Sequence, residues 1–400
     1  MATRTALTGN YAVARAMKQI KPDVVAAYPI TPQTDVVEEF SQFVADGLVP
    51  TEFVPCEGDH SAMSTCIGAA AAGARVMTAT SSQGLALMWE MLYIASGYRL
   101  PIVMALANRA LSGPINIHCD HSDGMGARDS GWIQIYCKNQ QEAYDTMLQA
   151  VRIAEHPDVL TPVMVCYDGF VVSHAMASVE LLDDDQAAAF VGTYTPKYPL
   201  LDTKHPVTYG PLVLFDYYHE MKRQQVEGIL SAPPVIEEVG RQFGDVSGRY
   251  YGLVEPYRLD DAEVAVVALG SAASTCEVVV DELRDAGVAA GSLRVRAFQP
   301  FPRDLVAKHL DGKKAVAVMD RAESFGARGG PLCTLVEASL YRAGKNVPVV
   351  NYIYGLGGRD TTTKDIHSVY DRIIGIARGG EVGQHYQYLS VRGGDGNGRN

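Results

Sequence analysis

The first part of the chain alternates short apolar runs with hydrophobic residues at helical spacing. Asp23–Tyr28 and Ile102–Ala107 are apolar runs that predict strands, and the second is apolar enough for a strand buried on both faces of its sheet. Strands that alternate with helices predict a parallel sheet covered by helices. The other helices and strands predicted in this part are Thr34–Ala45, Ser61–Gly73, Val76–Thr80, Leu85–Ala95, Gln140–Ala154 and Thr161–Tyr167.

The pattern changes near residue 176 and is restored near residue 260. Prolines recur over 176–259 and a helical pattern covers Phe215–Leu230, so we predict a linker region with its own helix. The fold class is therefore α/β, with two open parallel-sheet domains over 1–175 and 260–385, and a polar C-terminal tail over 386–400. The elements expected in the second domain are Val264–Leu269, Ser274–Ala286, Ser292–Ala297, Ala315–Met319, Pro331–Ala343 and Val349–Tyr354.

The composition is that of an ordinary globular protein with an acidic balance. Of 400 residues, 47% are apolar and 20% charged, and 34 basic against 46 acidic residues give a formal net charge of −12. This balance argues against a general nucleic-acid or anionic-membrane surface. No run of about 18 apolar residues is present, so we predict no membrane span. The N-terminus lacks the apolar core of a signal peptide, and we expect a cytoplasmic protein.

Seven widely spaced cysteines are expected to be reduced thiols, mostly in the cores. No Cys-x-x-Cys pair occurs, so we predict neither an iron–sulfur cluster nor a structural zinc site within this chain. His118-Cys119-Asp120-His121 contains metal-ligating residue types, but its spacing is not that of a helical ligand pair. We interpret it as a hydrogen-bonded loop anchor and assign no metal ligand.

Candidate catalytic or ligand-binding residues follow three of the apolar runs. Tyr28-Pro-Ile-Thr-Pro32 follows the first of them, and Glu57 lies at another junction of strand and loop. Ligands of open α/β sheets bind at this rim, and a carboxylate without Lys or Arg nearby in sequence is a candidate for proton handling. Arg109 follows Ile102–Ala107, where its guanidinium could either bind a ligand carboxylate or pair with a surface acid.

The segment Ala110–Asp129 has no clean periodicity. Irregular segments of this length inside a compact α/β domain are uncommon and usually functional. Ile115 and Ile117 alternate with polar residues, so this pair of apolar side chains could line a pocket.

Two pairs of adjacent charged residues are expected to be structural. Arg128-Asp129 predicts an internal ion pair that ties the irregular segment down. The turn Gly355–Asp360 is rich in glycine but matches neither G-x-G-x-x-G nor G-x-x-x-x-G-K-[ST], so it is not expected to bind phosphate. We predict instead a tight turn in which Arg359 and Asp360 form a charge pair.

Several ordered motifs together are more specific than any one of these features. They are Tyr28-Pro-Ile-Thr-Pro32, Glu57-Gly-Asp-His-Ser61, Thr78-Ala-Thr-Ser-Ser-Gln-Gly-Leu-Ala-Leu-Met88, Asn108-Arg-Ala-Leu-Ser-Gly-Pro-Ile-Asn-Ile117, Asp120-His-Ser-Asp123, Arg128-Asp-Ser-Gly-Trp132 and Gly355-Leu-Gly-Gly-Arg-Asp360. In this order, over nearly all 400 residues, the chain resembles the α subunit of the pyruvate:ferredoxin oxidoreductases, within the 2-oxoacid:ferredoxin oxidoreductase family.

The resemblance implies a fold and a reaction. The first domain resembles a thiamine-diphosphate pyrimidine domain, and the C-terminal domain resembles the transketolase C-terminal domain. The family decarboxylates a 2-oxoacid oxidatively with coenzyme A, and it yields acyl-CoA, carbon dioxide and electrons for ferredoxin, in some members reversibly. Pyruvate is the first expectation, and the retained loop Ala110–Ile115 weighs against oxalate, because the oxalate-using relatives carry a different loop after the arginine. Gln33-Thr34 and His118-Cys119 depart from the family pattern near the pocket, so a branched or aromatic 2-oxoacid stays open.

The resemblance also implies which residues touch the cofactor. Glu57 matches the acid that hydrogen-bonds the aminopyrimidine ring nitrogen and favours the imino tautomer, which takes a proton from the thiazolium carbon. The residues implied to contact the cofactor are Glu57, Tyr28, Pro29 and Ile30.

Four residues match the substrate side of the family site. Thr31 matches the hydroxyl that faces the oxo oxygen of the substrate, where negative charge develops. Arg109 matches the clamp on the substrate carboxylate, and Ile115 and Ile117 match the lining of its methyl pocket. Two other hypotheses remain: a non-oxidative thiamine-dependent carboligase, and a non-catalytic scaffold for a partner's cofactor.

Neither of the two predicted domains contains a Gly-Asp-Gly…Asn motif for diphosphate and Mg²⁺, and the chain lacks cluster cysteines. In the family, a β subunit holds the diphosphate and Mg²⁺, and [4Fe-4S] clusters lie in partner subunits. The resemblance therefore implies a twofold-symmetric hetero-oligomer with β, γ and ferredoxin-like subunits, which uses coenzyme A as co-substrate and ferredoxin as electron carrier.

Overall fold

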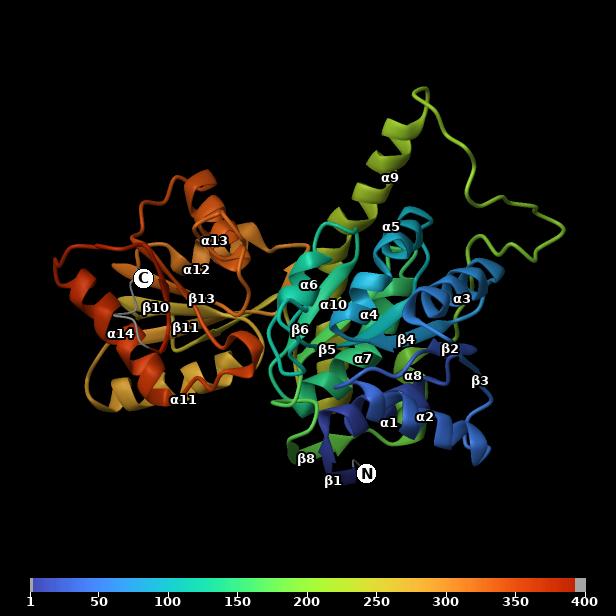
Figure 1. Ribbon diagram of the computed structural model, residues 1–400, viewed down its shortest axis with the longest axis horizontal. Coiled ribbons are helices and arrows are strands. Elements are labelled where there is room, and N and C mark those ends of the chain that lie inside the picture. Colours follow the sequence, from blue (N-terminus) through green and yellow to red (C-terminus); the bar gives the residue numbers. More distant parts are fainter. Residues whose placement is uncertain (1–2, 393–400) are drawn as a thin grey trace.

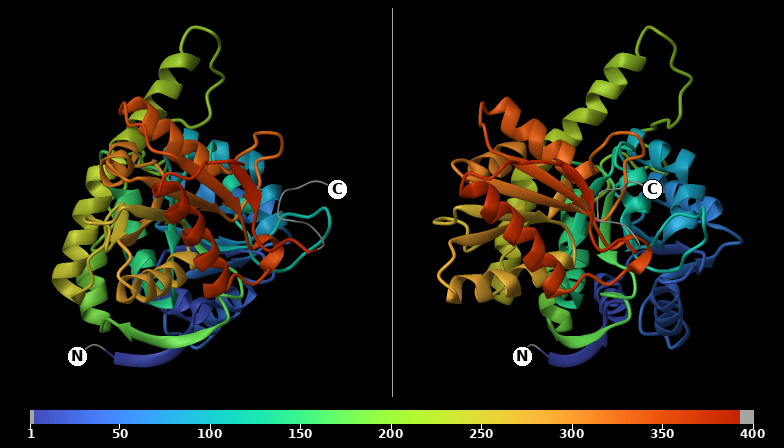
Figure 2. Two further views of the ribbon diagram at one scale, coloured as in Figure 1. Left: turned by 90° about the vertical axis from the view of Figure 1, so that its left-hand side faces the viewer. Right: turned by 60° about the vertical axis from the view of Figure 1, so that its left-hand side comes forward.

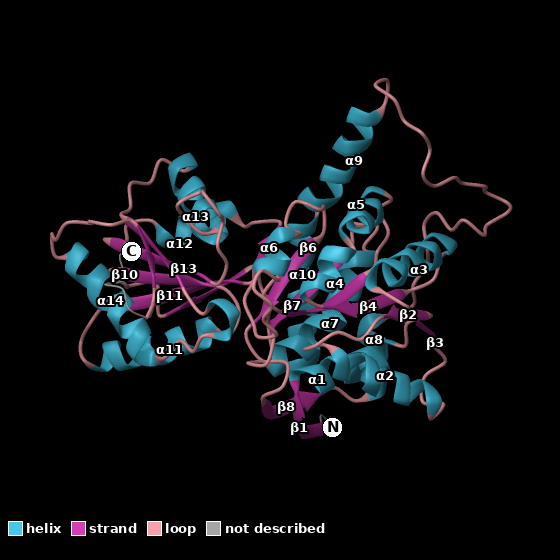
Figure 3. Ribbon diagram, viewed as in Figure 1, coloured by secondary structure: helices cyan, strands magenta, loops and turns pink. Residues whose placement is uncertain are grey.

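The computed structural model describes residues 3–392, and its first domain is built on a seven-stranded sheet (Figures 1 and 3). Six of its strands are parallel, and the antiparallel edge strand comes from the C-terminal half of the chain. In spatial order the strands are β12 (Ala297–Gln299), β6 (Ile133–Cys137), β7 (Val163–Asp168), β5 (Val103–Asn108), β4 (Val76–Thr80), β2 (Val24–Ala27) and β3 (Glu52–Pro55).

Helices cover both faces of this sheet, as the alternating pattern predicted. Thr34–Ala45 forms a helix with the predicted bounds, whereas the helix predicted over Leu85–Ala95 is two helices that meet at Met88. Apolar residues of α1, α2 and α7 form one core, and those of α3 and α5 contribute to the other. The helices are α1 (Gly9–Ile20), α2 (Thr34–Ala45), α3 (Asp59–Ala72), α4 (Ser82–Leu87), α5 (Trp89–Gly97), α6 (Ser122–Gly126) and α7 (Gln140–Glu155).

The region 176–259, which we predicted to be a linker with one helix, contains two strands and three helices. Pro233 and Pro234 indicated an irregular segment without a helix, but they lie in the first turn of a helix. Proline is tolerated there because the N–H groups of the first turn have no intrahelical partners. Ile236 and Phe243 of this helix are buried in the core that α7 shares. The helix predicted over Phe215–Leu230 is α9 (Tyr218–Leu230), and the elements that were not predicted are β8 (Met176–Leu181), which pairs with β1 (Thr3–Thr8), α8 (Asp184–Val191), α10 (Ala232–Ser247) and β9 (Val254–Tyr257).

The second domain contains a six-stranded sheet, parallel except for its edge strand β9. The strand predicted over Ser292–Ala297 is divided, because the chain leaves the second sheet after Val295 and pairs with the first sheet from Ala297 onward. Residues 386–388 of the predicted tail form a strand, and residues 393–400 lie outside the described part. The strands are β15 (Tyr386–Tyr388), β14 (Val349–Ile353), β13 (Ala315–Asp320), β10 (Val264–Ala268), β11 (Ala290–Val295) and β9 (Val254–Tyr257).

Helices α11 and α14 pack against one side of the second sheet, and α12 and α13 contact each other on the other (Figure 2). These helices are α11 (Ala272–Asp285), α12 (Arg303–Leu310), α13 (Pro331–Arg342) and α14 (Thr363–Ala377), with a short 3₁₀ turn at Leu356–Gly358. Within residues 3–392, no helix combines the length and the apolar character needed to cross a bilayer.

Buried charges join the two domains. Glu142 of α7 accepts hydrogen bonds from Arg294 at 2.8 Å and from Arg296 at 2.7 Å, and all three side chains are buried. Lys138 contacts Glu255 at 3.0 Å and Glu277 at 2.8 Å. These pairs and the β6–β12 pairing place the C-terminal domain beside the β6 edge of the first sheet (Figure 1).

Candidate active site

The parallel strands of the first sheet bring the predicted site residues to one rim. Thr31 follows β2, Glu57 follows β3 and Arg109 follows β5. Parallel strands end at the same edge of a sheet, and this edge is where open α/β folds bind ligands. The predicted neighbourhood of Thr31 and Arg109 is confirmed, because an Arg109 Nη1 hydrogen bond reaches the Thr31 carbonyl at 2.8 Å. The structure shows Glu57 on the next strand, without a direct contact to either residue among those described.

Arg109 is held by backbone carbonyls. Its side chain also donates through Nε to the Asn116 carbonyl at 2.9 Å, and the residue is only 6% exposed. Burial lowers the pKa of Arg109, but an arginine side chain remains protonated at neutral pH. No carboxylate among residues 3–392 forms an ion pair with this guanidinium. Of the two alternatives for Arg109, pairing with a surface acid is therefore not observed, and the charge is available to a ligand.

Asp123 holds the strand ends at this rim in place through hydrogen bonds, a role that the sequence analysis did not predict. Its carboxylate accepts hydrogen bonds from the backbone N–H of Arg109 at 2.9 Å, the backbone N–H of Ser82 at 3.0 Å and the Asn108 side chain at 2.8 Å. Burial raises the pKa of Asp123 to about 6, although these hydrogen bonds oppose the shift. This one side chain ties the ends of β4 and β5 together, and its only signal in the sequence is an acid within the irregular segment.

Glu57 presents an exposed carboxylate at the same rim. Its side chain accepts a hydrogen bond from the Ser61 hydroxyl at 2.5 Å, and this bond lowers the pKa of Glu57. Tyr28 and Pro29 are exposed and Ile30 is half-buried on the adjacent strand end, where the Gln33 side chain donates to the Tyr28 carbonyl at 2.9 Å. An anionic acceptor beside a partly apolar strand end is suited to hold a flat heteroaromatic ring.

The irregular segment forms a loop that stands over Arg109. The Ala110 N–H donates to the His118 carbonyl at 3.0 Å and closes the loop at its base. Ile115 and Ile117, at 78% and 43% exposure, lie near Arg109 in the loop but do not line a closed pocket within this chain. The predicted pair Arg128–Asp129 forms, with Nε of Arg128 3.7 Å from the Asp129 carboxylate, but it is not internal, because the two side chains are 38% and 76% exposed.

The charge pair predicted between Arg359 and Asp360 in the glycine-rich turn is not observed among the described residues. Arg359 instead donates through Nη1 to the Ser390 carbonyl at 3.1 Å, so its side chain is directed to the C-terminal segment. The contacts of this turn are described below.

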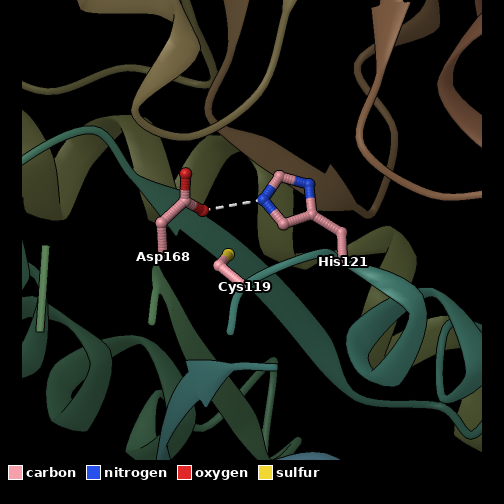
Figure 4. A group of neighbouring side chains, drawn as sticks. All are labelled: Cys119, His121 and Asp168. Atoms are coloured by element: carbon pink, nitrogen blue, oxygen red, sulfur yellow. Dashed lines mark hydrogen bonds and ion pairs between the residues drawn. The ribbon is translucent and has the colours of Figure 1, made fainter. Parts of the chain in front are cut away.

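The residues considered for a metal site anchor a loop, as we predicted. Figure 4 shows His121 pointing toward Asp168, with Nε2 2.7 Å from the carboxylate and Cys119 beside them. Asp168 also pairs with Arg321 at 2.8 Å and accepts hydrogen bonds from Ser271. Burial opposes ionisation of Asp168, but the charges of His121 and Arg321 outweigh it and hold its pKa well below the usual range.

Asp168 is the second important residue that sequence reasoning missed. It ends β7 of the first domain, whereas Ser271 and Arg321 belong to the second domain. A carboxylate directly after an apolar strand was the available signal. The cluster is therefore an interdomain network at the rim that also carries Arg109.

The rim fits one half of a thiamine diphosphate molecule. Glu57, Tyr28, Pro29 and Ile30 can hold the aminopyrimidine ring, since a carboxylate can accept a hydrogen bond from the ring N–H of its imino tautomer. The two groups of metal-ligating residues in the described part contain Cys and His, whereas Mg²⁺ prefers oxygen ligands alone. The residues of this rim thus fit the ring of the cofactor, and neither of these two groups in the described part is an all-oxygen set of the kind that Mg²⁺ prefers.

The fold and this rim define a thiamine-diphosphate-binding α/β protein with two domains. Residues 15–241 match the family model "Pyruvate flavodoxin/ferredoxin oxidoreductase, thiamine diP-bdg", and residues 262–366 match "Pyruvate:ferredoxin oxidoreductase core domain II". The chain therefore belongs to the pyruvate:ferredoxin oxidoreductase family of thiamine-diphosphate-dependent 2-oxoacid oxidoreductases.

Curated relatives extend along almost the whole chain. Pyruvate synthase subunit PorA of Thermotoga maritima is 55% identical, over 97% of this chain and 98% of its own length. The corresponding subunit of Methanocaldococcus jannaschii is 48% identical over 92% and 94%. Ketoisovalerate oxidoreductase subunit VorA of Pyrococcus abyssi is 39% identical over 96% and 97%.

Solved structures agree on the fold. The 2-oxoglutarate:ferredoxin oxidoreductase of Magnetococcus marinus gives a TM-score of 0.72 at 19% identity, over 93% of this chain and 65% of that one. A split-gene transketolase gives 0.53 at 13% identity, over 93% and 99%. The predicted α/β class, with a transketolase-like arrangement, is confirmed.

Proposed function

We propose that this chain is the α subunit of a pyruvate:ferredoxin oxidoreductase. The complex would convert pyruvate, coenzyme A and oxidised ferredoxin to acetyl-CoA, carbon dioxide and reduced ferredoxin. The observation that carries the choice of pyruvate is the 55% and 48% identity to pyruvate synthase subunits over nearly the full length. A branched 2-oxoacid is the second candidate, because a ketoisovalerate oxidoreductase subunit is 39% identical over a similar span.

Arg109 and Thr31 are proposed to bind the 2-oxoacid. The guanidinium is fixed by two carbonyls and has no carboxylate partner among the described residues, so it can orient the carboxylate of the substrate. The Thr31 side chain is exposed at the same rim, where its hydroxyl can donate to the oxo oxygen as negative charge develops. Ile115 and Ile117 are proposed to cover the substrate's methyl group.

Glu57 is proposed to hold the ring of thiamine diphosphate. When bound, this cofactor supplies the nucleophilic carbon that attacks the oxo group. The hydrogen bond from Ser61 lowers the Glu57 pKa, which favours the carboxylate form that can accept a hydrogen bond from the ring N–H of the imino tautomer. Tyr28, Pro29 and Ile30 are proposed to contact the ring from the adjacent strand end.

Partner subunits are proposed to complete this site. The exposed side chains of Glu57, Thr31 and Ile115, together with the absence of an all-oxygen ligand group in the described part, support a β subunit that holds the diphosphate and Mg²⁺. We propose a twofold-symmetric hetero-oligomer in which γ and ferredoxin-like subunits, the latter with [4Fe-4S] clusters, pass electrons to ferredoxin. All seven cysteines lie in the described part as free thiols, which supports a reducing compartment such as the cytoplasm.

The proposal is tested on the assembled complex. We expect viologen or ferredoxin reduction that requires both pyruvate and coenzyme A, with weaker turnover of 2-oxoisovalerate and phenylpyruvate. Turnover without an electron acceptor and without coenzyme A would support a non-oxidative carboligase instead. Activity that survives the loss of both Glu57 and Arg109 would make the chain a scaffold, and no reduction with any oxoacid would reject the proposal.

Arg109→Lys is expected to raise KM for the 2-oxoacid by about tenfold, which corresponds to the loss of about 1.4 kcal/mol of binding. Lysine keeps the charge but loses the planar fork that Thr31 and Asn116 hold in place. KM for coenzyme A should stay unchanged. Arg128→Lys, at an exposed position in the same segment, is the matched control. Identical oxoacid KM values for both variants would contradict the clamp.

A further inference from the structure

We propose that the glycine-rich turn Gly355–Gly358 of the C-terminal domain positions the 2-oxoacid pocket of the first domain. The turn contacts the loop 110–121, which carries Ile115 and Ile117 and touches Arg109. The inference rests on the proposed function, because that function assigns these residues to the substrate. It makes the second domain a part of the substrate-binding apparatus.

Three hydrogen bonds join the turn to the loop. The Asn116 side chain donates to the Gly357 carbonyl at 3.0 Å, and the Gly357 N–H donates to the Asp120 carboxylate at 3.2 Å. The Gly358 N–H donates to the Cys119 carbonyl at 2.7 Å. The turn is therefore hydrogen-bonded to the loop both at Asn116, between Ile115 and Ile117, and at the base of the loop.

The close approach requires glycine in the turn. Gly357 and Gly358 have φ values of 59° and 81°, which most side chains avoid. A Cβ on Gly357 would overlap the Asn116 side chain, and one on Gly358 would overlap the Cβ of His118. Because a Cβ is fixed to the backbone, rotation of the His118 ring cannot relieve that overlap. The loop backbone would have to move.

Other contacts restrict how His118 can move. Its ring packs on Phe170 with centroids 4.8 Å apart, and Phe170 stacks on His174 at 4.6 Å. The residue is thus held between the glycine turn on one side and an aromatic stack on the other. A displacement at Gly358 is passed to the loop and not absorbed by one side chain.

Movement of the loop reaches the proposed substrate contacts directly. The Asn116 carbonyl accepts from Arg109 Nε at 2.9 Å, and the His118 carbonyl accepts from the Ala110 N–H at 3.0 Å. Asn116 lies between Ile115 and Ile117 in the chain. A shift of the loop therefore moves the clamp and the apolar lining together.

The turn is itself fixed to the rim. Arg321 donates through Nε to the Gly355 carbonyl at 3.3 Å and pairs with Asp168 of the first domain at 2.8 Å. The Arg321 carbonyl accepts from the His121 N–H at 2.8 Å. The loop is thereby clamped against a support that spans both domains, which is the geometry of a positioning element.

Gly358→Ala in the assembled complex tests the proposal. We expect KM for the 2-oxoacid to rise about tenfold, with kcat within about twofold and KM for coenzyme A unchanged. Amide hydrogen exchange over residues 110–121 should become faster in the same complex. The control is Gly287→Ala, because Gly287 has the same φ of 81° and its Cβ would meet no atom within 4 Å.

Asn116→Asp supplies a second variant if Gly358→Ala fails to fold. It removes the donor to Gly357 but keeps the acceptor for the His118 N–H, 2.7 Å away. We expect it to raise oxoacid KM in the same way. Equal oxoacid KM and exchange for the variants and the control would overturn the inference and leave the proposed function standing. A wild-type complex without oxoacid-dependent turnover would overturn both.

Discussion

Glu57→Gln is expected to reduce oxoacid-dependent turnover by about a hundredfold or more, with no change in Tm. Glutamine can still accept the hydrogen bond from Ser61, but it lacks the negative charge that we assign to ring binding. Glu57 is exposed, so folding of the chain does not depend on its charge. The measurements are the steady-state rate of the complex with saturating cofactor, and its thermal unfolding.

Glu52→Gln is the matched control, because Glu52 is an exposed acid at the opposite end of the same strand. It should leave the rate unchanged. Equal rates for the two variants would remove Glu57 from the mechanism. A fall in Tm for Glu57→Gln alone would instead assign it to assembly of the complex.

Asp168→Asn is expected to destabilise the chain by about 3–5 kcal/mol, because it leaves the buried Arg321 cation without its anion. The side chains of Asp168 and Arg321 are 0% and 6% exposed, so water cannot replace the lost partner. Denaturant unfolding at neutral pH measures the difference. Asp158→Asn, at a side chain 78% exposed, is the control and should change little.

The same pair gives a pH dependence with a defined sign. The pKa of Asp168 is lowered in the folded state, so its charge stabilises the fold above the ordinary carboxyl pKa of about 3.9 and this contribution is lost as pH falls. The stability gap between wild type and Asp168→Asn should therefore shrink below about pH 4. A gap that stays constant would mean that Asp168 acts by packing and not by charge.

Local pattern was sufficient for most of the first domain. β4 and α2 have the predicted bounds, because their apolar periodicity coincides with the faces that they bury. The same reasoning failed at Pro233 and Pro234, since a proline pair ends one helix as readily as it begins another. Which of these applies depends on the packing of α10 against α7, and that contact lies far away in the sequence.

The site residues also fall into those that local pattern could predict and those that depend on distant contacts. Thr31 and Arg109 could be placed together because the ends of parallel strands meet at one rim. Asp168 could not, because its partners Ser271 and Arg321 belong to another domain and no periodicity reports a long-range polar contact. The glycines of the turn were visible as a motif, but only the loop opposite them explains why a side chain does not fit there.

Strand β12 belongs to the C-terminal part of the chain by sequence but to the sheet of the first domain by hydrogen bonding. It lies after β11 of the second sheet, yet it pairs with β6 and completes the edge of the first. A chain cut near residue 250 would expose β6 as an open edge, which is prone to pair with other molecules. Residues 1–250 are therefore not a self-contained module, because their sheet is completed by a strand that the C-terminal part of the chain supplies.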